Sequence, residues 1–440
     1  MLERHRRLLL KQNPQWRDEP LETYEFKRDL FDTFSKYLKH KQILAVVGLR
    51  RVGKTVLLKQ NLETLSKKAN SQNLCYISFD DRDFQKYEIA EDLINYFLEF
   101  SNKKFKRYLF LDEIQKVENW PDLLKTYYDL EKNLKIVISG SSSLELKEYK
   151  ETLAGRIVTI HMPIFTFREY IRFSGLKSEI SFKNLLREYD LNFLANKEKY
   201  EILFNNYLLK GAFPELLDVD DEDFIKKYIR ESVIEKVVAD VSKTDDIRRP
   251  DIVYELLSIF SKNTGRIFEI INISNALSLN RNVIANYIYV LEKTFLIKIN
   301  YNYTKSAIKR ARTSKKAYIA HCCIPIALLD YPFSILEIDG EDRGYLVEST
   351  IANSIEGTSF WRTPQKHEVD IVVEDDSILP MEVKYRKEVR KSDIKGLFKF
   401  LERFNLNKGV VITKDLLKIE QIESREIIYI PAWLFLLLSQ

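Results

Sequence analysis

Short apolar runs alternate with amphipathic stretches in the first part of the chain. The runs have the length of buried strands and lie at residues 43–47, 74–79, 108–111 and 135–138. Residues 24–38 instead carry apolar side chains at three- and four-residue spacing, which predicts a helix. Residues 1–22 are polar and contain two prolines, so we expect an arm there. The alternation of strands and helices predicts an α/β fold with a parallel sheet.

The pattern changes to closely spaced helices in the second part of the chain. Residues 173–250 are rich in Leu, Phe and Tyr and predict a helical lid or connector. Three helices are then expected at 254–260, 271–277 and 281–293, followed by a strand at 295–299. Three short helices and a strand ribbon are typical of a winged helix-turn-helix. On the third helix the inner face is predicted to hold Val283, Ile284, Tyr287, Ile288 and Leu291. The start and outer face of that helix are predicted to hold Asn280, Arg281, Asn282 and Asn286.

The last part of the chain predicts a further α/β domain. A helix is expected to begin at residues 344–348, and strands are expected at 368–373 and 381–384. Glu382 and Lys384 point to the same face of their strand because side chains alternate with a period of two. A hairpin between the two strands would bring Asp370 beside them.

The segment after the first strand has the spacing Gly-x4-Gly-Lys-Thr, which is typical of a phosphate-binding loop when a helix follows. The residues expected to hold the nucleotide are Gly48, Leu49, Arg50, Arg51, Val52, Gly53, Lys54, Thr55 and Val56. The glycines let the backbone turn its N–H groups towards an anion, and the helix adds its positive end. Lys54 can reach the β- and γ-phosphates of ATP, and Thr55 can give its hydroxyl to Mg2+. The alternative is a chance turn, but the chain has only 12 glycines and two stand at the required positions.

Asp112 and Glu113 follow the apolar run 108–111 and form a second nucleotide-site pattern. Asp112 can hold the hydration shell of Mg2+, and Glu113 can polarise the attacking water. Many buried strands end in an acid, so the pattern alone is weak. Its position about sixty residues after the phosphate loop, within a strand–helix alternation, makes it strong.

Four further residues leave two interpretations open. Ser139 or Ser141, at the end of the next strand, could sense the γ-phosphate or could form an ordinary turn. Arg156 could neutralise transition-state charge on its own or a neighbouring subunit's nucleotide, or could be a surface arginine. Arg28 could approach the nucleotide or could be a solvated helix charge.

Composition narrows the class of protein. The hydrophobic fraction is 45% and the charged fraction is 31%, as in globular proteins. A chain of 440 residues predicts roughly two to four domains. Its apolar runs fall far short of the ~20 residues that span a membrane. The 3 cysteines cannot form a disulfide framework or an all-cysteine zinc site, so we expect a cytoplasmic protein that is not bound to a membrane.

Positive charge gathers in one stretch, although the net charge of +5 is mild. No acid occurs between Lys293 and Leu329. The basic residues of this stretch are Lys293, Lys298, Lys305, Lys309, Arg310, Arg312, Lys315 and Lys316. Tyr301 and Tyr303 lie in the same stretch and could stack on bases. A solvated face is the alternative, but the coincidence with the predicted wing favours nucleic-acid contact.

Several of these segments together resemble the prokaryotic AAA+-type ATPases of the archaeal-ATPase group. The segments are Gly48–Thr55, Leu111–Gln115, Asn119–Trp120, Ser139–Ser142, Leu153–Arg156, Phe165–Tyr170 and Tyr207–Glu215. Ala212 departs from the group, which usually has a second glycine there. The group commonly has an aspartate near Tyr318–Ile319, where this chain has Ala320-His321-Cys322-Cys323 and where we expect a core strand more readily than a metal site. Members usually join the ATPase to a winged helix and a C-terminal nuclease-type domain, which implies an ATPase that acts on DNA.

Asp370-x11-Glu382-x-Lys384 resembles the PD-(D/E)XK nuclease core, with Glu348 in the position of the helix acid. Asp370 and Glu382 can hold Mg2+ for phosphodiester cleavage, and Lys384 can help to position or deprotonate water. The alternative is an ordinary strand pair with exposed charges. A nuclease fold can also survive as a binding module without cleavage.

These patterns predict an α/β chain in four parts. The parts are a P-loop ATPase core at 1–172, a helical lid at 173–250, a winged helix-turn-helix at 251–329 and a nuclease-like domain at 330–440. The expected function is ATP hydrolysis coupled to DNA binding, with ATP and Mg2+ as cofactors and metal-dependent cleavage left open. The alternative is an ATP-gated DNA-binding or scaffolding switch with an inactive nuclease fold. A homo-oligomer is compatible with either function.

Overall fold

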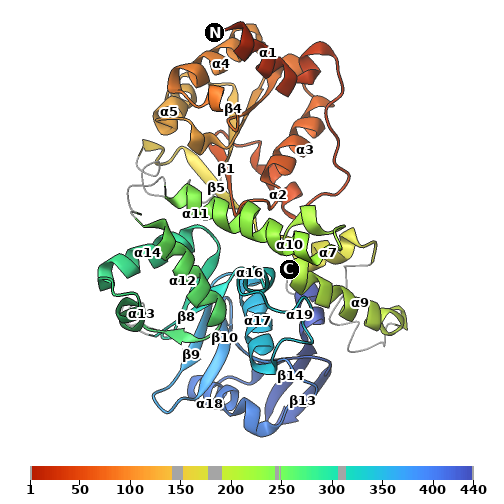
Figure 1. Ribbon diagram of the computed structural model, residues 1–440. Coiled ribbons are helices and arrows are strands. Elements are labelled where there is room, and N and C mark those ends of the chain that lie inside the picture. The colour runs from red at the N-terminus through yellow and green to blue at the C-terminus, as the bar shows by residue number, and fades with distance from the viewer. Residues whose placement is uncertain are drawn as a thin grey trace. The chain divides into compact units, whose positions relative to one another are not determined.

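The computed structural model describes residues 2–140, 152–176, 191–242, 247, 249–305 and 314–438. The chain forms two compact units, residues 1–164 and 165–440 (Figure 1). Each unit is described by itself below. No helix in the described ranges is both long enough and apolar enough to cross a membrane.

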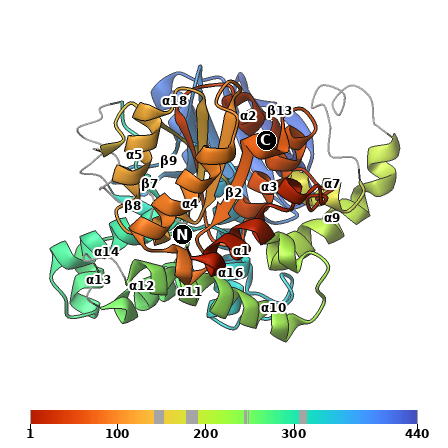
Figure 2. The same ribbon diagram turned by 90° about the horizontal axis from the view of Figure 1, so that it is seen from above.

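The first unit is built on a parallel sheet, as predicted. Its five strands lie in the order β2-β3-β4-β1-β5. They are β1 Ile43–Val47, β2 Leu74–Ser78, β3 Arg107–Asp112, β4 Leu134–Gly140 and β5 Ile157–His161. The main helices are α1 Glu3–Gln12, α2 Leu30–Tyr37, α3 Lys54–Ser66, α4 Tyr87–Phe100 and α5 Trp120–Leu130. Helices α2 and α3 lie on one side of the sheet and α4 and α5 on the other (Figures 1 and 2). All of β1 is buried, so the loop that follows it starts from the interior of the sheet.

Residues 1–22 do not form a simple arm, because α1 covers the open edge of the sheet. Strand β2 is an edge strand, and its outer backbone groups need partners. The side-chain amide of Asn13 donates to the Tyr76 carbonyl and accepts from the Tyr76 N–H, both at 2.7 Å. Gln12 accepts from the Ser78 N–H at 2.9 Å. Side-chain amides therefore take the place of a further strand.

The helix predicted at residues 24–38 begins only at Leu30. The earlier residues are bonded to α3 instead of to one another. Gln60 on α3 donates its side-chain amide to the carbonyls of Tyr24 at 3.1 Å and Phe26 at 2.7 Å. The apolar spacing continues through this segment, but its carbonyls are already used, so a helix does not form there.

The second unit begins with helices. They are α7 Phe167–Phe173, α9 Leu191–Lys210, α10 Glu222–Tyr228 and α11 Glu235–Val241, and a π-helical segment at Ile229–Ile234 joins the last two. Then follow α12 Pro250–Lys262, α13 Ile270–Ala276 and α14 Arg281–Lys293. A small antiparallel sheet has the order β6-β8-β7, from β6 Ile267–Phe268, β7 Ile297–Tyr301 and β8 Lys315–Ile319.

Three details of this region differ from the predictions. Val283 was placed on the inner face of the third helix, but its side chain is 38% exposed. The strand predicted at 295–299 begins at Ile297, because Phe295 adopts a left-handed conformation with φ 63°. The segment Ala320–Cys323 is buried, but it is a turn that leads into α16, Cys323–Leu328, and not a strand.

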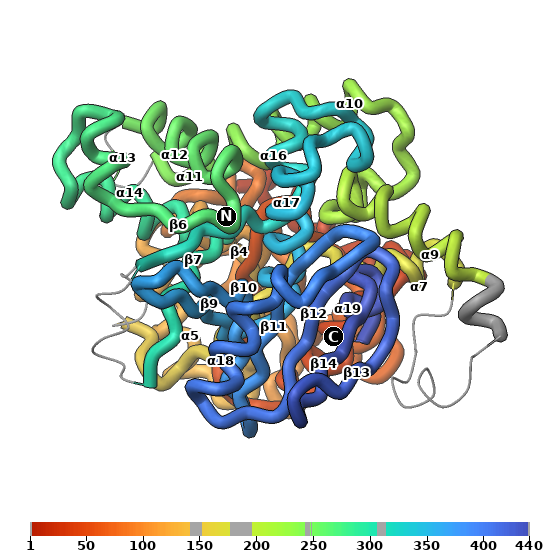
Figure 3. The backbone as a smooth tube through the Cα atoms, turned by 90° about the horizontal axis from the view of Figure 1, so that it is seen from below, coloured from red at the N-terminus to blue at the C-terminus, as the bar shows by residue number. Residues whose placement is uncertain are grey.

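A mixed sheet of six strands completes the second unit, in the order β13-β14-β12-β11-β10-β9. The strands are β9 Thr358–Arg362, β10 Glu368–Glu374, β11 Ile378–Lys384, β12 Lys408–Thr413, β13 Lys418–Ile422 and β14 Arg425–Pro431. The helices are α17 Gly340–Asn353, α18 Lys395–Phe404 and α19 Ala432–Leu438. The small sheet lies beside β9 and β10 (Figure 3), and one bridge between Asn302 and Phe360 joins it to β9.

Candidate functional site

In the loop between β1 and α3, the side chain of Lys54 is hydrogen-bonded to backbone carbonyls of the same loop. Lys54 is buried, and its Nζ donates to the carbonyls of Gly48 at 3.0 Å and Leu49 at 2.9 Å. Gly53 has φ 97°, a conformation that favours glycine. A Cβ on Gly48 would lie 2.4 Å from the carbonyl oxygen of Met162. One glycine is therefore required by backbone conformation and the other by space.

Asp112 ends β3 and is surrounded by hydroxyl groups. Its Oδ2 accepts hydrogen bonds from Thr55 Oγ1 at 2.7 Å and from the Tyr76 hydroxyl at 2.8 Å. Its Oδ1 accepts from the Ser139 hydroxyl. Burial and the neighbouring Asp112 carboxylate raise the pKa of Tyr76, which keeps its proton on the hydroxyl. The structure thus brings Thr55, Asp112 and Ser139 together as predicted site neighbours, whereas Ser141 lies outside the described residues.

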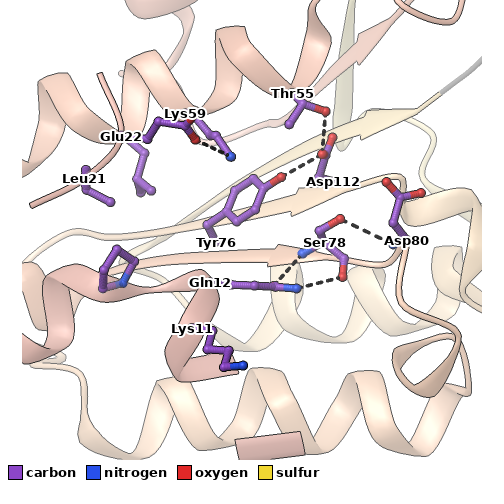
Figure 4. A pocket seen from close by; sticks show the side chains of 12 residues that line it. Lys11, Gln12, Leu21, Glu22, Thr55, Lys59, Tyr76, Ser78, Asp80 and Asp112 are labelled. Carbon is purple, nitrogen blue, oxygen red and sulfur yellow. Dashed lines mark hydrogen bonds and ion pairs between the residues drawn. The ribbon is translucent and has the colours of Figure 1, made fainter. Parts of the chain in front are cut away.

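A cavity of about 410 Å³ opens beside Thr55 and Asp112 (Figure 4). Its lining residues are Lys11, Gln12, Pro14, Leu21, Glu22, Thr55, Lys59, Leu62, Tyr76, Ser78, Asp80 and Asp112. Hydroxyl and carboxylate oxygens such as those of Thr55 and Asp112 are ligands that Mg2+ takes. The donor set therefore fits the metal ion that a P-loop site uses.

Glu113 follows Asp112 in a left-handed conformation, with φ 55°. Its backbone N–H donates to Ser139 Oγ at 3.2 Å. Its Oε2 accepts a hydrogen bond of 2.6 Å from the side-chain amide of Gln115. The turn and the amide fix the direction of the carboxylate. Sequence reasoning gave Gln115 no role, because nothing in the local pattern separates it from an ordinary turn residue.

Arg156 lies away from the phosphate loop. Its carbonyl accepts from the N–H of Ile43, the first residue of β1, and its guanidinium pairs with Asp129 at 3.0 Å. Because β1 and β5 are parallel, Arg156 is at the amino end of the strands, while Lys54 follows the carboxyl end. A strand of this length spans about 16 Å. The structure therefore does not bring Arg156 to the nucleotide site of its own chain.

Arg28 is buried, so its interpretation as a solvated charge is wrong. Its guanidinium donates to the carbonyls of Val52 at 2.6 Å, Pro163 at 3.0 Å and Ile164 at 3.1 Å. It links the phosphate loop to the chain after β5.

The four residues of the predicted nuclease-like site are buried or nearly so, and they converge. Lys384 Nζ lies 2.7 Å from Glu382 Oε1 and 3.6 Å from Asp370 Oδ2, so both carboxylates face the same ammonium. Asp370 Oδ2 also accepts from the Val383 N–H at 2.9 Å. The antiparallel pairing of β10 with β11 produces this contact, as the predicted hairpin requires. Glu348 reaches the same place from α17, which begins at Gly340 and not at the predicted Gly344.

A residue that the sequence analysis placed in the basic stretch lies among these acids. Lys316 of β8 is 1% exposed. Its Nζ is 2.7 Å from Glu368 Oε1, 3.0 Å from Glu348 Oε1 and 3.5 Å from Asp370 Oδ1. Tyr318, two residues further on the same face of β8, donates to Glu348 Oε1 at 2.7 Å. No group of three or more His, Cys, Asp or Glu in the described ranges is arranged to hold a metal ion.

Burial and charge shift the titration of this cluster. Burial and the neighbouring Asp370 raise the pKa of Glu348 to about 7 and that of Glu382 to about 8. Burial opposes ionisation of Asp370 as well, but Lys384 and Lys316 hold the pKa of this carboxyl below its usual value. Asp370 is therefore the carboxylate that stays ionised between the two lysines.

The basic stretch is less exposed than its sequence suggested. Besides Lys316, Lys298 turns inward, and its Nζ donates to the carbonyls of Ala352 and Ile355, both at 2.7 Å. Tyr303 is 4% exposed, so its predicted stacking on bases is wrong. Lys305 is exposed, and Lys293 and Lys315 are half-buried. Lys309, Arg310 and Arg312 lie outside the described ranges.

Three family models match separate segments of the chain. Residues 40–171 match a family model described as an AAA domain. Residues 201–333 and 345–434 match two models described as domains of unknown function, DUF8612 and DUF4143. Among solved structures, the chain is 12% identical to the Aeropyrum pernix ORC1 protein in complex with DNA, with a TM-score of 0.31, covering 69% of this chain and 92% of that one.

Two relatives align over most of the chain. The chain is 24% identical over 410 residues to an uncharacterized Haemophilus influenzae protein, covering 89% of this chain and 94% of that protein. It is 30% identical over 435 residues to the uncharacterized protein MJ1637 of Methanocaldococcus jannaschii, covering 93% of this chain and 88% of the relative. The chain therefore belongs to the same family as MJ1637, and its first unit carries an AAA domain with a parallel-sheet P-loop core.

Proposed function

We propose that this protein binds and hydrolyses ATP and couples that cycle to DNA binding. The observation that supports hydrolysis is the hydrogen bond of 2.7 Å between Thr55 and Asp112, formed where the phosphate loop meets the end of β3. Lys54 and Glu113 are the sequence neighbours of this pair. A chance turn would not require a hydroxyl and a buried carboxylate to meet there.

Each of these residues has a distinct role in the proposal. Lys54 exchanges its two carbonyl partners in the loop for the β- and γ-phosphates. Thr55 and Asp112 hold Mg2+, which supplies charge neutralisation at the phosphates when it is bound. Glu113 orients the attacking water and accepts its proton, with Gln115 fixing the resting direction of the carboxylate. Ser139 responds to the γ-phosphate in this proposal, which its contacts with the Asp112 carboxylate and the Glu113 backbone N–H support.

Two substitutions test hydrolysis. Lys54→Ala is expected to weaken ATP binding, because the phosphates lose their point charge. Glu113→Gln is expected to retain ATP while turnover falls by roughly 10²- to 10⁴-fold, because an amide cannot take the proton from water. Binding of a fluorescent ATP analogue and phosphate release measure the two steps. The exposed residues Lys67 and Glu118 supply the matched controls Lys67→Ala and Glu118→Gln. Wild-type turnover by Glu113→Gln would refute the assignment.

DNA contact is proposed for the region of α12–α14 and the small sheet, as a winged helix. The start of α14 supports this proposal, because Asn280 caps the helix by accepting from the Asn282 N–H at 2.8 Å and Arg281 and Asn282 are exposed. A helix that presents polar side chains in its first turn suits a groove of DNA. The basic residues Lys309, Arg310 and Arg312 between β7 and β8 are proposed to contact phosphates.

The salt dependence of binding tests that contact. Replacing Lys309, Arg310 and Arg312 by Ala is expected to lower the slope of log affinity against log salt by about one per lost contact, for any sequence. The control replaces the exposed Lys103, Lys104 and Lys132 by Ala, which removes the same charge from the first unit. Equal slopes for both triple variants would show that the stretch is only a solvated face.

Cleavage of DNA is a second candidate function for the last part of the chain. The convergence of Asp370, Glu382 and Lys384 with Glu348 supports a nuclease-like arrangement. The position of Lys316 favours the alternative, a DNA-binding or scaffolding switch whose nuclease fold is inactive. Nicking of plasmid and branched DNA with Mg2+ or Mn2+, with and without ATP, separates the two. Cleavage that Asp370→Ala abolishes would support the nuclease.

The division into four domains and the role of Arg156 remain proposals. Arg156 pairs with Asp129 at the far end of its sheet, so a catalytic role would act on the nucleotide of a neighbouring subunit. This role requires a homo-oligomer. Mixing Arg156→Ala subunits with Lys54→Ala subunits tests it, because only a shared site would make the activity of the mixture differ from the sum of its parts.

A further inference from the structure

The acidic cluster of the C-terminal sheet already contains a cation that belongs to the chain. Three carboxylates, those of Glu348, Glu368 and Asp370, lie within 3.5 Å of Lys316 Nζ. Lys316 comes from β8, which precedes the acids in sequence and belongs to the small sheet. A divalent ion shared by Glu348 and Asp370 would need oxygen ligands at ~2.1 Å. The ammonium and the metal ion would therefore compete for the same oxygens.

Rigid elements hold the ammonium in place. Strand β8 pairs with both β6 and β7, and Tyr318 on the same face is bonded to Glu348. Thr264, in the turn before β6, accepts from the Ile319 N–H of β8 at 3.0 Å and donates to Ser349 of α17 at 3.1 Å. Gly265 lies close against the same helix, since a Cβ there would come within 2.9 Å of Tyr345. The packing of β8 therefore fixes the position of Lys316 in the cluster, and Lys316 is not a mobile surface side chain.

The balance between carboxylates and ammonium groups in the cluster also supports a role for Lys316 as its cation. Glu368 has a separate partner in Arg362 at 3.2 Å. The remaining carboxylates of Glu348, Asp370 and Glu382 face two ammonium groups, those of Lys316 and Lys384. If Lys316 were absent and all three carboxylates were ionised, as they would be when they ligate a metal ion, the formal excess would be two negative charges, which is the charge that a divalent metal ion neutralises. In addition, Glu382 Oε2 is buried without a hydrogen-bond partner in the described ranges, so a ligand oxygen is already desolvated there.

We propose that Lys316 is the resident cation of the Glu348–Asp370–Glu382 cluster, and that this cluster binds Mn2+ or Mg2+ only when the Lys316 ammonium is absent. The proposal rests on the nuclease-like arrangement proposed above, but not on ATP hydrolysis or DNA binding. It makes metal uptake and docking of β8 mutually exclusive. In this proposal the acids of the nuclease-type fold hold the small sheet against the C-terminal sheet through Lys316, and they do not bind a metal ion.

Binding of Mn2+ to the nucleotide-free full chain tests the proposal, followed by electron paramagnetic resonance. Wild type and Asp370→Asn are expected to bind equally, because Lys316 excludes the ion from this cluster. Lys316→Met keeps the length of the side chain and removes its charge, and it is expected to gain one site at least ten-fold tighter than any in wild type. The double variant Lys316→Met with Asp370→Asn should lose that site.

Lys298→Met is the matched control. Lys298 is a second inward-facing lysine of the small sheet, but its Nζ bonds carbonyl oxygens and not carboxylates. It is expected to gain no site. If Lys316→Met folds poorly, Mn2+ should raise its melting temperature and leave that of Lys298→Met unchanged.

Three results would overturn the proposal. The first is an Asp370-dependent site in wild type, which would mean that Lys316 does not exclude metal. The second is a folded Lys316→Met that gains no site. The third is a poorly folded Lys316→Met that Mn2+ does not stabilise. None of these results depends on ATP turnover, so failure here is distinguishable from failure of the proposed ATPase.

Discussion

Asp112 and Asp370 are both buried aspartates on strands, yet the two units surround them differently. Asp112 accepts hydrogen bonds from the hydroxyl groups of Thr55, Tyr76 and Ser139. Asp370 lies between the ammonium groups of Lys316 and Lys384. Hydroxyl groups satisfy the oxygens of a carboxylate but leave its charge, whereas ammonium groups neutralise it.

The difference separates an acid that is ready for a cation from one that already has cations. The cavity of about 410 Å³ beside Asp112 leaves room for an ion and a ligand. At Asp370 the space is taken by side chains of the chain itself. A convergent set of acids is therefore not sufficient to identify a metal site. Cationic side chains packed against the acids can neutralise them, and a metal ion is then not needed.

The largest expected effect is on stability. Asp370→Asn leaves the buried ammonium of Lys316 and the partly buried ammonium of Lys384 short of a carboxylate, and it should lower the free energy of unfolding of the second unit by about 3 to 5 kcal/mol. Asp112→Asn keeps an oxygen that accepts from hydroxyl groups, so its cost should be near 1 kcal/mol. Urea unfolding, with hydrogen exchange in β3 and in β10 to locate the change, measures both. Equal losses of unfolding free energy in the two variants would contradict the proposed difference between the two aspartates.

The next effect is on turnover. Asp112→Asn should slow ATP hydrolysis by about 100-fold or more, because a neutral amide holds a metal ion poorly and transition-state charge is left less stabilised. The measurement is phosphate release at saturating ATP and several Mg2+ concentrations. Asp92→Asn, on α4, is the matched control in the same unit. Recovery of full turnover at high Mg2+ would mean that Asp112 contributes to affinity alone.

Single hydroxyl groups should have a smaller effect on stability than Asp370→Asn. Tyr76→Phe and Tyr318→Phe each remove one hydrogen bond to a buried carboxylate, which should cost about 1.5 to 3 kcal/mol of stability. Only Tyr76→Phe should also change the Mg2+ dependence of ATP hydrolysis, because its partner is Asp112. Thermal melting and a Mg2+ titration distinguish the two variants. A changed Mg2+ dependence in Tyr318→Phe would contradict the separation of the two sites.

The local sequence pattern was sufficient to predict the strands that position Thr55 and Asp112. The apolar run at 43–47 became β1, and the acid after the run 108–111 ended β3. The contact between Thr55 and Asp112 follows once β1 and β3 are known to be parallel strands of one sheet, because their carboxyl ends share an edge. Tyr76 was not found, since its hydroxyl reaches Asp112 from a neighbouring strand and its own segment is simply apolar.

Lys316 shows where local pattern fails. In sequence it is one of eight basic residues in a stretch without acids, which is typical of an exposed face. Its partners Glu348 and Asp370 lie 32 and 54 positions further along the chain. A weak local signal was present, because Lys316 and Tyr318 share one face of a strand and could serve the same partner. The identity of that partner depends on how two sheets pack, and no periodicity contains this information.

The contact between α1 and β2 has a consequence for the order of folding. The amides of Gln12 and Asn13 can reach their partners only after β2 has paired with β3, because the edge that they cover does not exist before. They nevertheless leave the ribosome before either strand. We therefore expect α1 and Asn13 to pack onto the sheet late in folding. Until then β2 presents an unpaired edge to other chains.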